Sequence, residues 1–280
     1  MTRDRGLRDP QGFTLIEMMV AVAILIVVLL ALYATLNGAQ RAAMVSTRHV
    51  QTRDTGRVAI QLMERDLRMA GSGWGLVAVE TSDNGNPLQL RGIMPGPGAV
   101  SDSIRILGSW GGIARLSQDM PLSTSAIRVD SLAGFTAGDL CVVTNDEGSA
   151  HLFQVTSIGT APNTLVTGPS PWNTAGGHAS WPAGGYRQGT TVYRVALVSY
   201  AVDSVTYRRP SIVRTEHGQA SQLVAYDVHD LQIWYGLLNG ARTRAPSDLS
   251  MIREIAPVIH AQTGSSSQDS SWTAVRPRVF

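Results

Sequence analysis

A single long apolar run near the N-terminus most constrains how this chain can fold. Between Phe13 and Gln40 the only charged residue is Glu17. The stretch Phe13–Leu36 is long enough, as a helix, to cross a hydrocarbon core of about 30 Å, which takes about 20 residues. A carboxylate so close to the start of that stretch costs on the order of a few kcal/mol in lipid. We therefore expect Glu17 to find a partner.

A polar leader precedes the apolar run. It carries Arg3, Arg5 and Arg8, and it ends at Gly12. Arginines beside an apolar helix hold that end in the cytoplasm by the positive-inside rule. We therefore expect one transmembrane helix in the inner membrane, with the bulk of the chain on its periplasmic side.

The segment Gly12-Phe13-Thr14-Leu15-Ile16-Glu17 resembles the N-terminus of type IV prepilins and pseudopilins. The resemblance implies that prepilin peptidase cuts after Gly12 and that Phe13 becomes the methylated first residue. It also implies that Glu17 is the assembly carboxylate, paired with the N-terminal amine of a neighbouring subunit. These three residues are the predicted functional sites.

Two other interpretations of the N-terminus remain open. An ordinary secretory signal has an apolar core of about 7–15 residues and is cut after it, at a small-residue site. Here that cut would fall near Ala39, although the core is longer and contains an acid. A plain membrane anchor is the second alternative, and it leaves Glu17 unexplained.

The residues that follow predict a helix that continues to about residue 70. An apolar stripe recurs at three- and four-residue spacing, formed by Ile60, Met63, Leu67 and Ala70 and widened by Val58 and Leu62. Glu64 and Arg68 are four residues apart and are expected to pair on the exposed face. Gly71–Gly75 then ends the helix, because glycine favours the C-terminal cap.

From residue 71 onward, short apolar runs alternate with turn residues, which predicts antiparallel β-structure. The expected strands are Ser103–Leu107, Ala126–Val129, Asp139–Thr144, His151–Ser157, Thr191–Val202, Val205–Arg209 and Leu223–Tyr235. A long loop is expected at about 160–189, a hairpin turn at Asp203-Ser204, and a mobile segment over Thr263–Ser271. The predicted fold class is α+β: a leader (1–12), a pilin-like helix (13–70, transmembrane over 13–36) and a β-rich domain (71–280).

Three further blocks narrow the resemblance to the PilW-type minor pilins. They are Arg57–Ala59 with Glu64–Gly71, Val198–Val202 before Tyr207–Arg209, and Val228–Gly236. The resemblance implies partnership with other minor pilins, the major pilin and a PilY-type tip adhesin. The J-type pseudopilin of type II secretion shares the prepilin start and a similar helix end, so it stands as the alternative.

The sequence offers little support for catalysis, and we expect no enzyme activity, cofactor or metal. No nucleophile elbow is present, and the six histidines (49, 151, 178, 217, 229 and 260) have no metal-ligand spacing. Asp83–Asn86 and Asn145–Gly148 are read as turns in preference to calcium loops. Cys141 is the only cysteine and is read as a buried small hydrophobe.

Two surface features have competing readings. Arg208, Arg209 and Arg214 form a small basic cluster, which we read as a solvated strand edge in preference to a DNA-binding patch. The net charge of +2 gives no support to nucleic-acid binding. Trp172 and Trp181, in the long loop, are either an interface anchor or a lid over the core.

These features together predict a structural minor pilin that primes type IV pilus assembly and ends at or near the pilus tip on the cell surface. The main alternative is a type II secretion pseudopilin at the tip of a periplasmic pseudopilus. A third is a membrane-tethered module whose β-domain captures a ligand.

Overall fold

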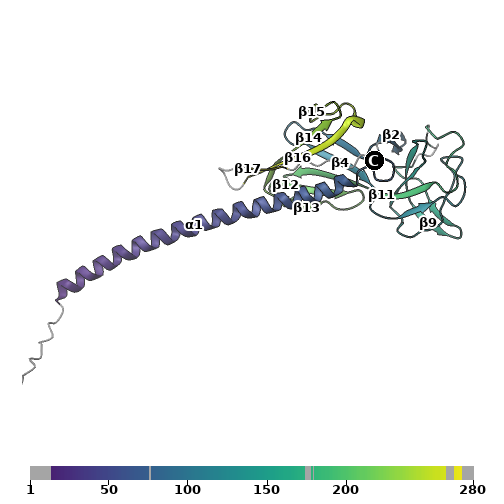
Figure 1. Ribbon diagram of the computed structural model, residues 1–280. Coiled ribbons are helices and arrows are strands. Elements are labelled where there is room, and N and C mark those ends of the chain that lie inside the picture. The colour runs from purple at the N-terminus through teal and green to yellow at the C-terminus, as the bar shows by residue number, and fades with distance from the viewer. Residues whose placement is uncertain (1–13, 76, 174–177, 179, 263–267, 273–280) are drawn as a thin grey trace, which may run out of the picture. The chain divides into compact units, whose positions relative to one another are not determined.

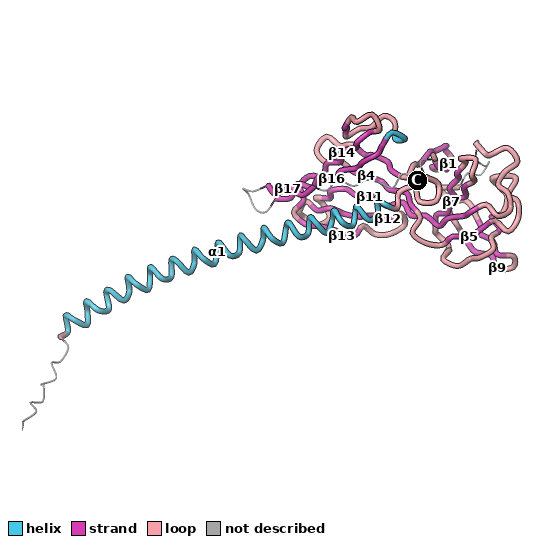
Figure 2. Tube along the Cα trace, in the orientation of Figure 1, coloured by secondary structure: helices cyan, strands magenta, loops and turns pink. Residues whose placement is uncertain are grey.

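The computed structural model describes residues 14–75, 77–173, 178, 180–262 and 268–272. Its first element is α1 (Leu15–Arg68), a continuous helix of 54 residues. The chain divides into two compact units at Gln51 and Thr52, so α1 belongs to both. The rest of the described chain is strands and loops, with one short 3-10 helix, η1 (Leu249–Met251) (Figure 2).

In the described part of the chain seventeen strands follow the helix, and Figure 1 labels most of them. They are β1 (Val79–Asp83), β2 (Asn86–Leu90), β3 (Ile93–Gly96), β4 (Ser103–Gly108), β5 (Ile113–Arg115), β6 (Ile127–Arg128), β7 (Leu140–Thr144), β8 (Ala150–Gln154), β9 (Ser157–Thr160), β10 (Asn163–Val166), β11 (Thr191–Asp203), β12 (Ser211–Glu216), β13 (Gln222–Tyr226), β14 (Val228–Leu237), β15 (Arg242–Thr243), β16 (Ile252–Gln262) and β17 (Gln268–Trp272).

The strands form three sheets, of which the largest is ordered β13-β12-β11-β7-β8-β1-β2, with β3, β4 and β5 attached beside this path. β6-β10-β9 and β15-β14-β16-β17 form the smaller sheets. Pairing is antiparallel except between β1 and β8, where Glu80 lies opposite His151. The predicted α+β class, with an apolar N-terminal helix and a mostly antiparallel β-domain, is confirmed.

The long strand β11 organises the domain. Its first residues pair with β5 and β7, and its later residues pair with β4 and β12. Its sequence is rich in valine and tyrosine, which suit a pleated and half-buried surface. One strand therefore joins the part of the domain next to α1 to the part that carries the long loop.

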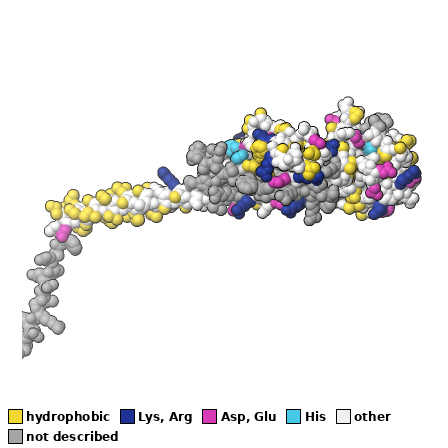
Figure 3. Space-filling view, turned by 45° about the horizontal axis from the view of Figure 1, so that its top comes forward, with side chains coloured by type: hydrophobic (Ala, Val, Ile, Leu, Met, Phe, Trp, Pro, Cys, Tyr) yellow, Lys and Arg dark blue, Asp and Glu magenta, His cyan; other side chains and the backbone are white. Residues whose placement is uncertain are grey.

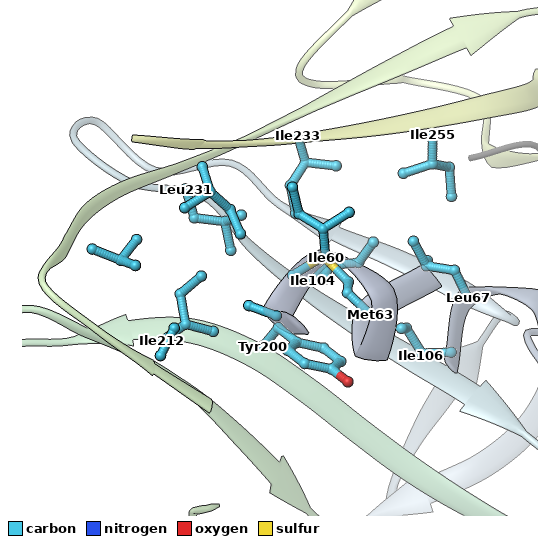
Figure 4. Packing of buried hydrophobic residues seen from close by; sticks show 14 of the residues in the cluster. Ile60, Met63, Leu67, Ile104, Ile106, Tyr200, Ile212, Leu231, Ile233 and Ile255 are labelled. Carbon is cyan, nitrogen blue, oxygen red and sulfur yellow. The ribbon is translucent and has the colours of Figure 1, made fainter. Parts of the chain in front are cut away.

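The last turns of α1 pack onto the sheets through a cluster that we call the helix–sheet core. Ile60, Met63 and Leu67 lie on one face of the helix and are buried there (Figure 4). They belong to one buried cluster with residues of five strands: Ile104, Ile106, Val198, Tyr200, Ile212, Leu231, Ile233, Tyr235, Ile255 and Ile259, among others. The predicted apolar stripe is confirmed at these helix positions, and Leu62 is partly buried beside it. Val58 is 57% exposed, so its assignment to the stripe is wrong.

Glycines make the junction after α1 tight. The helix ends at Arg68, and Ala70 already bridges to Gly108. Gly71 has φ of 68°, and its N–H donates to the Leu107 carbonyl at 2.9 Å. A Cβ at Gly71 would lie 2.3 Å from the Gly75 oxygen. Glycine is therefore required here by both backbone conformation and space.

Several predicted strand boundaries are corrected. Val205–Arg209 is not a strand, because Asp203 Oδ1 accepts the N–H groups of Val205 and Thr206 and holds a turn, so β12 begins at Ser211. The run Leu223–Tyr235 is broken by Asp227, whose φ of 59° ends β13 before β14 begins.

Other boundaries shift in the same way. The predicted strand His151–Ser157 is two elements, because β8 ends at Gln154 and β9 starts at Ser157. The predicted long loop contains β10. Part of the segment expected to be mobile, Gln268–Ser271, lies in β17 and pairs with β16, while 263–267 lie outside the described residues.

Candidate functional site

Thr14 and Glu17 form the polar start of α1. The Glu17 N–H donates to Thr14 Oγ1 at 3.3 Å, and Glu17 Oε2 accepts from the Thr14 N–H at 3.4 Å. This reciprocal pair is a capping box, which satisfies backbone N–H groups that a helix start leaves without partners. The sequence analysis missed it, although the signal Thr14-x-x-Glu17 was there to read. Glu17 therefore supports the helix locally, whatever its role in assembly.

Gly12 and Phe13, the predicted cleavage and methylation residues, lie outside the described residues. Their roles remain predictions. Glu17 is described, and its side chain is exposed within the first turn of α1. A carboxylate at this end also complements the positive end of the helix dipole. Its chemistry is thus that of an anion held at a fixed place on a helix.

An apolar surface surrounds that anion. The large hydrophobic side chains between Leu15 and Leu36 are between 50% and 79% exposed. Figure 3 shows them as a continuous hydrophobic surface that begins beside the acidic residue. Leu15–Met44 is long and apolar enough to cross a membrane. Because water solvates such a surface poorly, this part of α1 requires lipid or other apolar helices around it.

The three arginines of the predicted basic cluster do not share one surface role. Arg209 pairs with Asp227 at 3.3 Å and lies over the Tyr226 ring, 4.5 Å from its centroid. Arg214 is only 12% exposed and bonds Asp66 on α1. The reading of Arg214 as part of a solvated edge is therefore wrong, because its guanidinium is used inside the domain.

Asp66 is a buried carboxylate that the sequence analysis did not single out. Its side chain is fully buried, and its Oδ2 accepts from Arg214 Nε at 2.8 Å and from the Tyr200 hydroxyl at 2.7 Å. The available signal was its position between Met63 and Leu67, on the buried side of the helix. Burial alone would lower the pKa of Arg214, but the hydrogen bond and charge of Asp66 raise it overall. Arg214 is thus firmly charged.

A second buried carboxylate, Asp102, binds the sheets to each other. Its oxygens accept from Arg244 Nε and Nη2 at 3.1 and 2.7 Å and from the Ile233 and Gly98 N–H groups. Burial would raise the pKa of Asp102, but these donors lower it overall. This pair and the pair of Asp66 with Arg214 both connect elements of the fold.

The two loop tryptophans pack against the domain. Trp172 Nε1 donates to His217 Nε2 at 3.1 Å, and Trp181 Nε1 donates to the Pro121 carbonyl at 3.0 Å. Each ring is partly buried against a hydrophobic cluster. This arrangement favours the interpretation that the two tryptophans cover the hydrophobic core, in preference to an interface anchor.

His151 and Cys141 are both buried, and burial shifts the pKa of each. His151 is buried, with Nδ1 at 2.6 Å from the Tyr186 hydroxyl, and its ring lies 5.1 Å from that of His178. Burial, with a smaller contribution from His178, lowers the pKa of His151 to about 4. Burial raises the pKa of Cys141 to about 12, so its thiol is not reactive near neutral pH. Among the described residues no group of three or more ligating side chains could hold a metal ion.

Both suspected calcium loops are turns. Asn84 and Gly85 have φ of 51° and 90° and connect β1 to β2, as expected for a tight hairpin. In the second loop, Asn145 Oδ1 accepts the Ser149 N–H and closes the turn between β7 and β8. In the first loop Asp83 Oδ1 accepts from the Asn84 side-chain amide, and in the second the Asn145 side chain bonds the backbone of its own turn.

Comparison with known proteins adds one finding. Residues 7–33 match the prokaryotic N-terminal methylation motif, which covers Gly12, Phe13 and Glu17. No curated protein and no solved structure matches this chain. The methylation motif, set on an apolar N-terminal helix that is long enough to span a membrane, indicates a membrane-anchored protein of the type IV pilin-like or pseudopilin kind.

Proposed function

We propose that this protein is a structural minor pilin of the PilW type, processed by prepilin peptidase, that primes type IV pilus assembly and ends at or near the fibre tip. The observation that carries the proposal is Glu17, a single carboxylate at the start of an apolar helix whose side chains are exposed. The helix needs a neighbour for its surface, and the carboxylate needs a neighbour for its charge.

The mechanism is physical, with no enzymatic step. In lipid the Glu17 carboxylate has no cationic partner, and its desolvation is costly. Cleavage before Phe13 would create an amine on each subunit, and a neighbour's amine would neutralise Glu17 in a bundle of helices. Joining the fibre then relieves an electrostatic cost and buries apolar surface in one step. The pairing of one charge with one amine also sets the axial offset between subunits.

The β-domain supports the choice of a PilW-type subunit through three sequence blocks. The helix end, Val198–Val202 and Val228–Gly236 all contribute side chains to the helix–sheet core. Far apart in the sequence, they thus form one structural unit. We infer that this unit presents the domain to other minor pilins, the major pilin and a PilY-type adhesin. Before assembly, the protein would stay in the inner membrane with its β-domain in the periplasm.

A J-type secretion pseudopilin is the second candidate, favoured by the helix end Arg65-Asp66-Leu67-Arg68, which resembles both families. Quantitative mass spectrometry of sheared surface fibres separates the two. A trace of this chain relative to the major subunit, starting at methylated Phe13, would support the minor pilin. Processed protein that is absent from fibres and confined to the envelope would support the pseudopilin. Pilus or secretion genes beside its own would give the same distinction cheaply.

A further inference from the structure

Asp66, Tyr200 and Arg214 form a buried polar triad between α1 and the sheet. Asp66 comes from the helix, Tyr200 from β11 and Arg214 from β12. Both donors meet the same oxygen, Asp66 Oδ2, and Arg214 Nη1 also lies 3.3 Å from Glu216. Figure 4 shows Tyr200 beside Ile60 and Met63 in the helix–sheet core. The triad thus stands where the helix meets two neighbouring strands.

The triad is a poor way to gain stability. Asp66 Oδ1 is buried without a hydrogen-bond partner among the described residues, and Arg65 Nε is 4.0 Å away on an exposed side chain. A buried acceptor left without a partner is costly. Burying the two charges of a pair is also costly, and apolar residues of similar volume are often as stabilising. Stability alone therefore does not explain this arrangement.

The triad can define the position of the end of α1 against the sheet. The apolar contacts of α1 come from Ile60, Met63 and Leu67, spaced by one turn, and such contacts are not directional. A helix with a repeating stripe can rotate or shift slightly and still bury it. The hydrogen bonds of Asp66 form at one rotation and one axial position only, because two donors on different strands must reach one oxygen.

We propose that Asp66, Tyr200 and Arg214 are positioning residues that fix the rotation and axial position of the end of α1 against the sheet. This deepens the proposed function, because a subunit bound to its neighbours through its helix presents its β-domain in the direction that this junction sets. A buried polar group that specifies register is the best-attested role for such groups. The triad acts through the helix and touches no partner itself.

The test replaces the triad by apolar residues of similar size: Asp66→Leu, Tyr200→Phe and Arg214→Met together, in the full chain in detergent micelles. Spin labels at Gln61→Cys on α1 and Ile113→Cys on β5, both exposed, report the distance between helix and sheet. Cys141 is buried and stays unlabelled. The matched control is Glu64→Gln, which removes only the surface pair between Glu64 and Arg68.

We expect one narrow distance in the parent and in the Glu64→Gln control. The triple variant should unfold cooperatively at a melting temperature close to that of the parent, yet its distance distribution should broaden or gain a second component. A narrow, unshifted distance in a folded triple variant would overturn the proposal. If the triple variant does not fold, Arg214→Lys keeps the charge and removes the Nε donor. Broadening there supports the proposal, and an unchanged distance overturns it.

Fibre incorporation gives a readout that separates this inference from the proposed function. The distance measurement needs no pilus, so it stands or falls by itself. A triple variant with a broadened distance should also enter fibres severalfold less than the parent. Normal incorporation of such a variant would overturn the link between triad and assembly. Absence of the parent from fibres would instead count against the minor-pilin function and leave the distance result intact.

Discussion

The two ends of α1 are parts of one helix with opposite surfaces. Between Leu15 and Leu36 the large apolar side chains are exposed, whereas Ile60, Met63 and Leu67 are buried by the protein's own strands. Each end also holds a carboxylate, Glu17 or Asp66. Asp66 has its cation, Arg214, within the same chain, and Glu17 has no cationic partner among the described residues. The β-domain end of α1 is therefore satisfied within the chain, whereas the N-terminal end exposes apolar surface and an unpaired carboxylate.

The largest expected effect is the loss of N-terminal cleavage in a Gly12 variant. Gly12→Asp should abolish cleavage, because the resemblance assigns the cut to the bond after Gly12. The protein should then run at the size of the precursor on a gel, remain in the membrane and be absent from fibres. A mature-sized band from this variant would refute the assigned cleavage site. Gly6→Asp, within the same leader, is the control and should be processed normally.

Glu17 variants test the charge that the N-terminal end leaves without a partner. Glu17→Val should be cleaved and membrane-bound, yet it should be nearly lost from sheared fibres measured by mass spectrometry. Glu17→Gln is the sharper variant, because glutamine keeps the capping box and removes the charge. It should fail as Glu17→Val does, although its helix content by circular dichroism matches the parent. Normal incorporation of Glu17→Gln would show that capping, and not charge, is the requirement.

A matched pair of leucines compares the two ends directly. Leu67 is fully buried, whereas Leu32 is 54% exposed. Leu67→Ala should lower the free energy of unfolding of the β-domain by about 2–5 kcal/mol, through lost burial and a cavity. Leu32→Ala should leave it unchanged within about 0.5 kcal/mol. Denaturant titration in micelles, followed by tryptophan fluorescence, measures both. Equal losses would contradict the contrast.

Acid should weaken the β-domain. The pKa of buried His151 is about 4 in the folded protein, against about 6.5 for an exposed histidine. The unfolded chain therefore binds this proton more tightly. The contribution of neutral His151 to the free energy of unfolding is fully present above about pH 6.5. It is lost as the pH falls toward about 4, by up to about 3 kcal/mol.

Thermal unfolding measured at about pH 7.5 and about pH 5 checks this expectation. His151→Phe should reduce the difference between the two conditions, and the exposed His229→Gln should not. A pH dependence that is the same in the His151→Phe variant and the parent would show that other groups are responsible.

Two glycines give the smallest contrast. Gly71→Ala should cost about 1–3 kcal/mol, because its φ of 68° and the nearby Gly75 oxygen both oppose a side chain. Gly38 lies within α1, and a Cβ added there would meet no atom within 4 Å outside the neighbouring helix backbone. Because alanine has the higher helix propensity, Gly38→Ala should favour the helix by up to about 1 kcal/mol. Melting temperatures and helix content distinguish them. A tolerated Gly71→Ala would show that the junction relaxes.

Sequence patterns succeeded where the cause is local. Helical spacing gave the buried face of α1 at Ile60, Met63 and Leu67, and the pair of Glu64 with Arg68 forms as expected. Strand β4 and the turn between β7 and β8 also agree with the sequence. The predictions failed where a single residue redirects the chain: Asp203 holds a turn that the apolar pattern hides, and Asp227 interrupts a run that reads as one strand.

The N-terminal part of this protein can be understood from its residues without the fold. An apolar run with one acid, preceded by arginines, indicates a helix that lies in an apolar environment. It also indicates that Glu17 carries a charge without a partner nearby in the sequence. The roles of Asp66 and Arg214 depend on the fold, because these residues are 148 positions apart along the chain. Arg214 reads in sequence as one of three surface arginines, and folding alone brings it to a buried carboxylate. No local pattern marks Arg214 as buried, because the carboxylate that compensates its burial comes from a distant part of the chain.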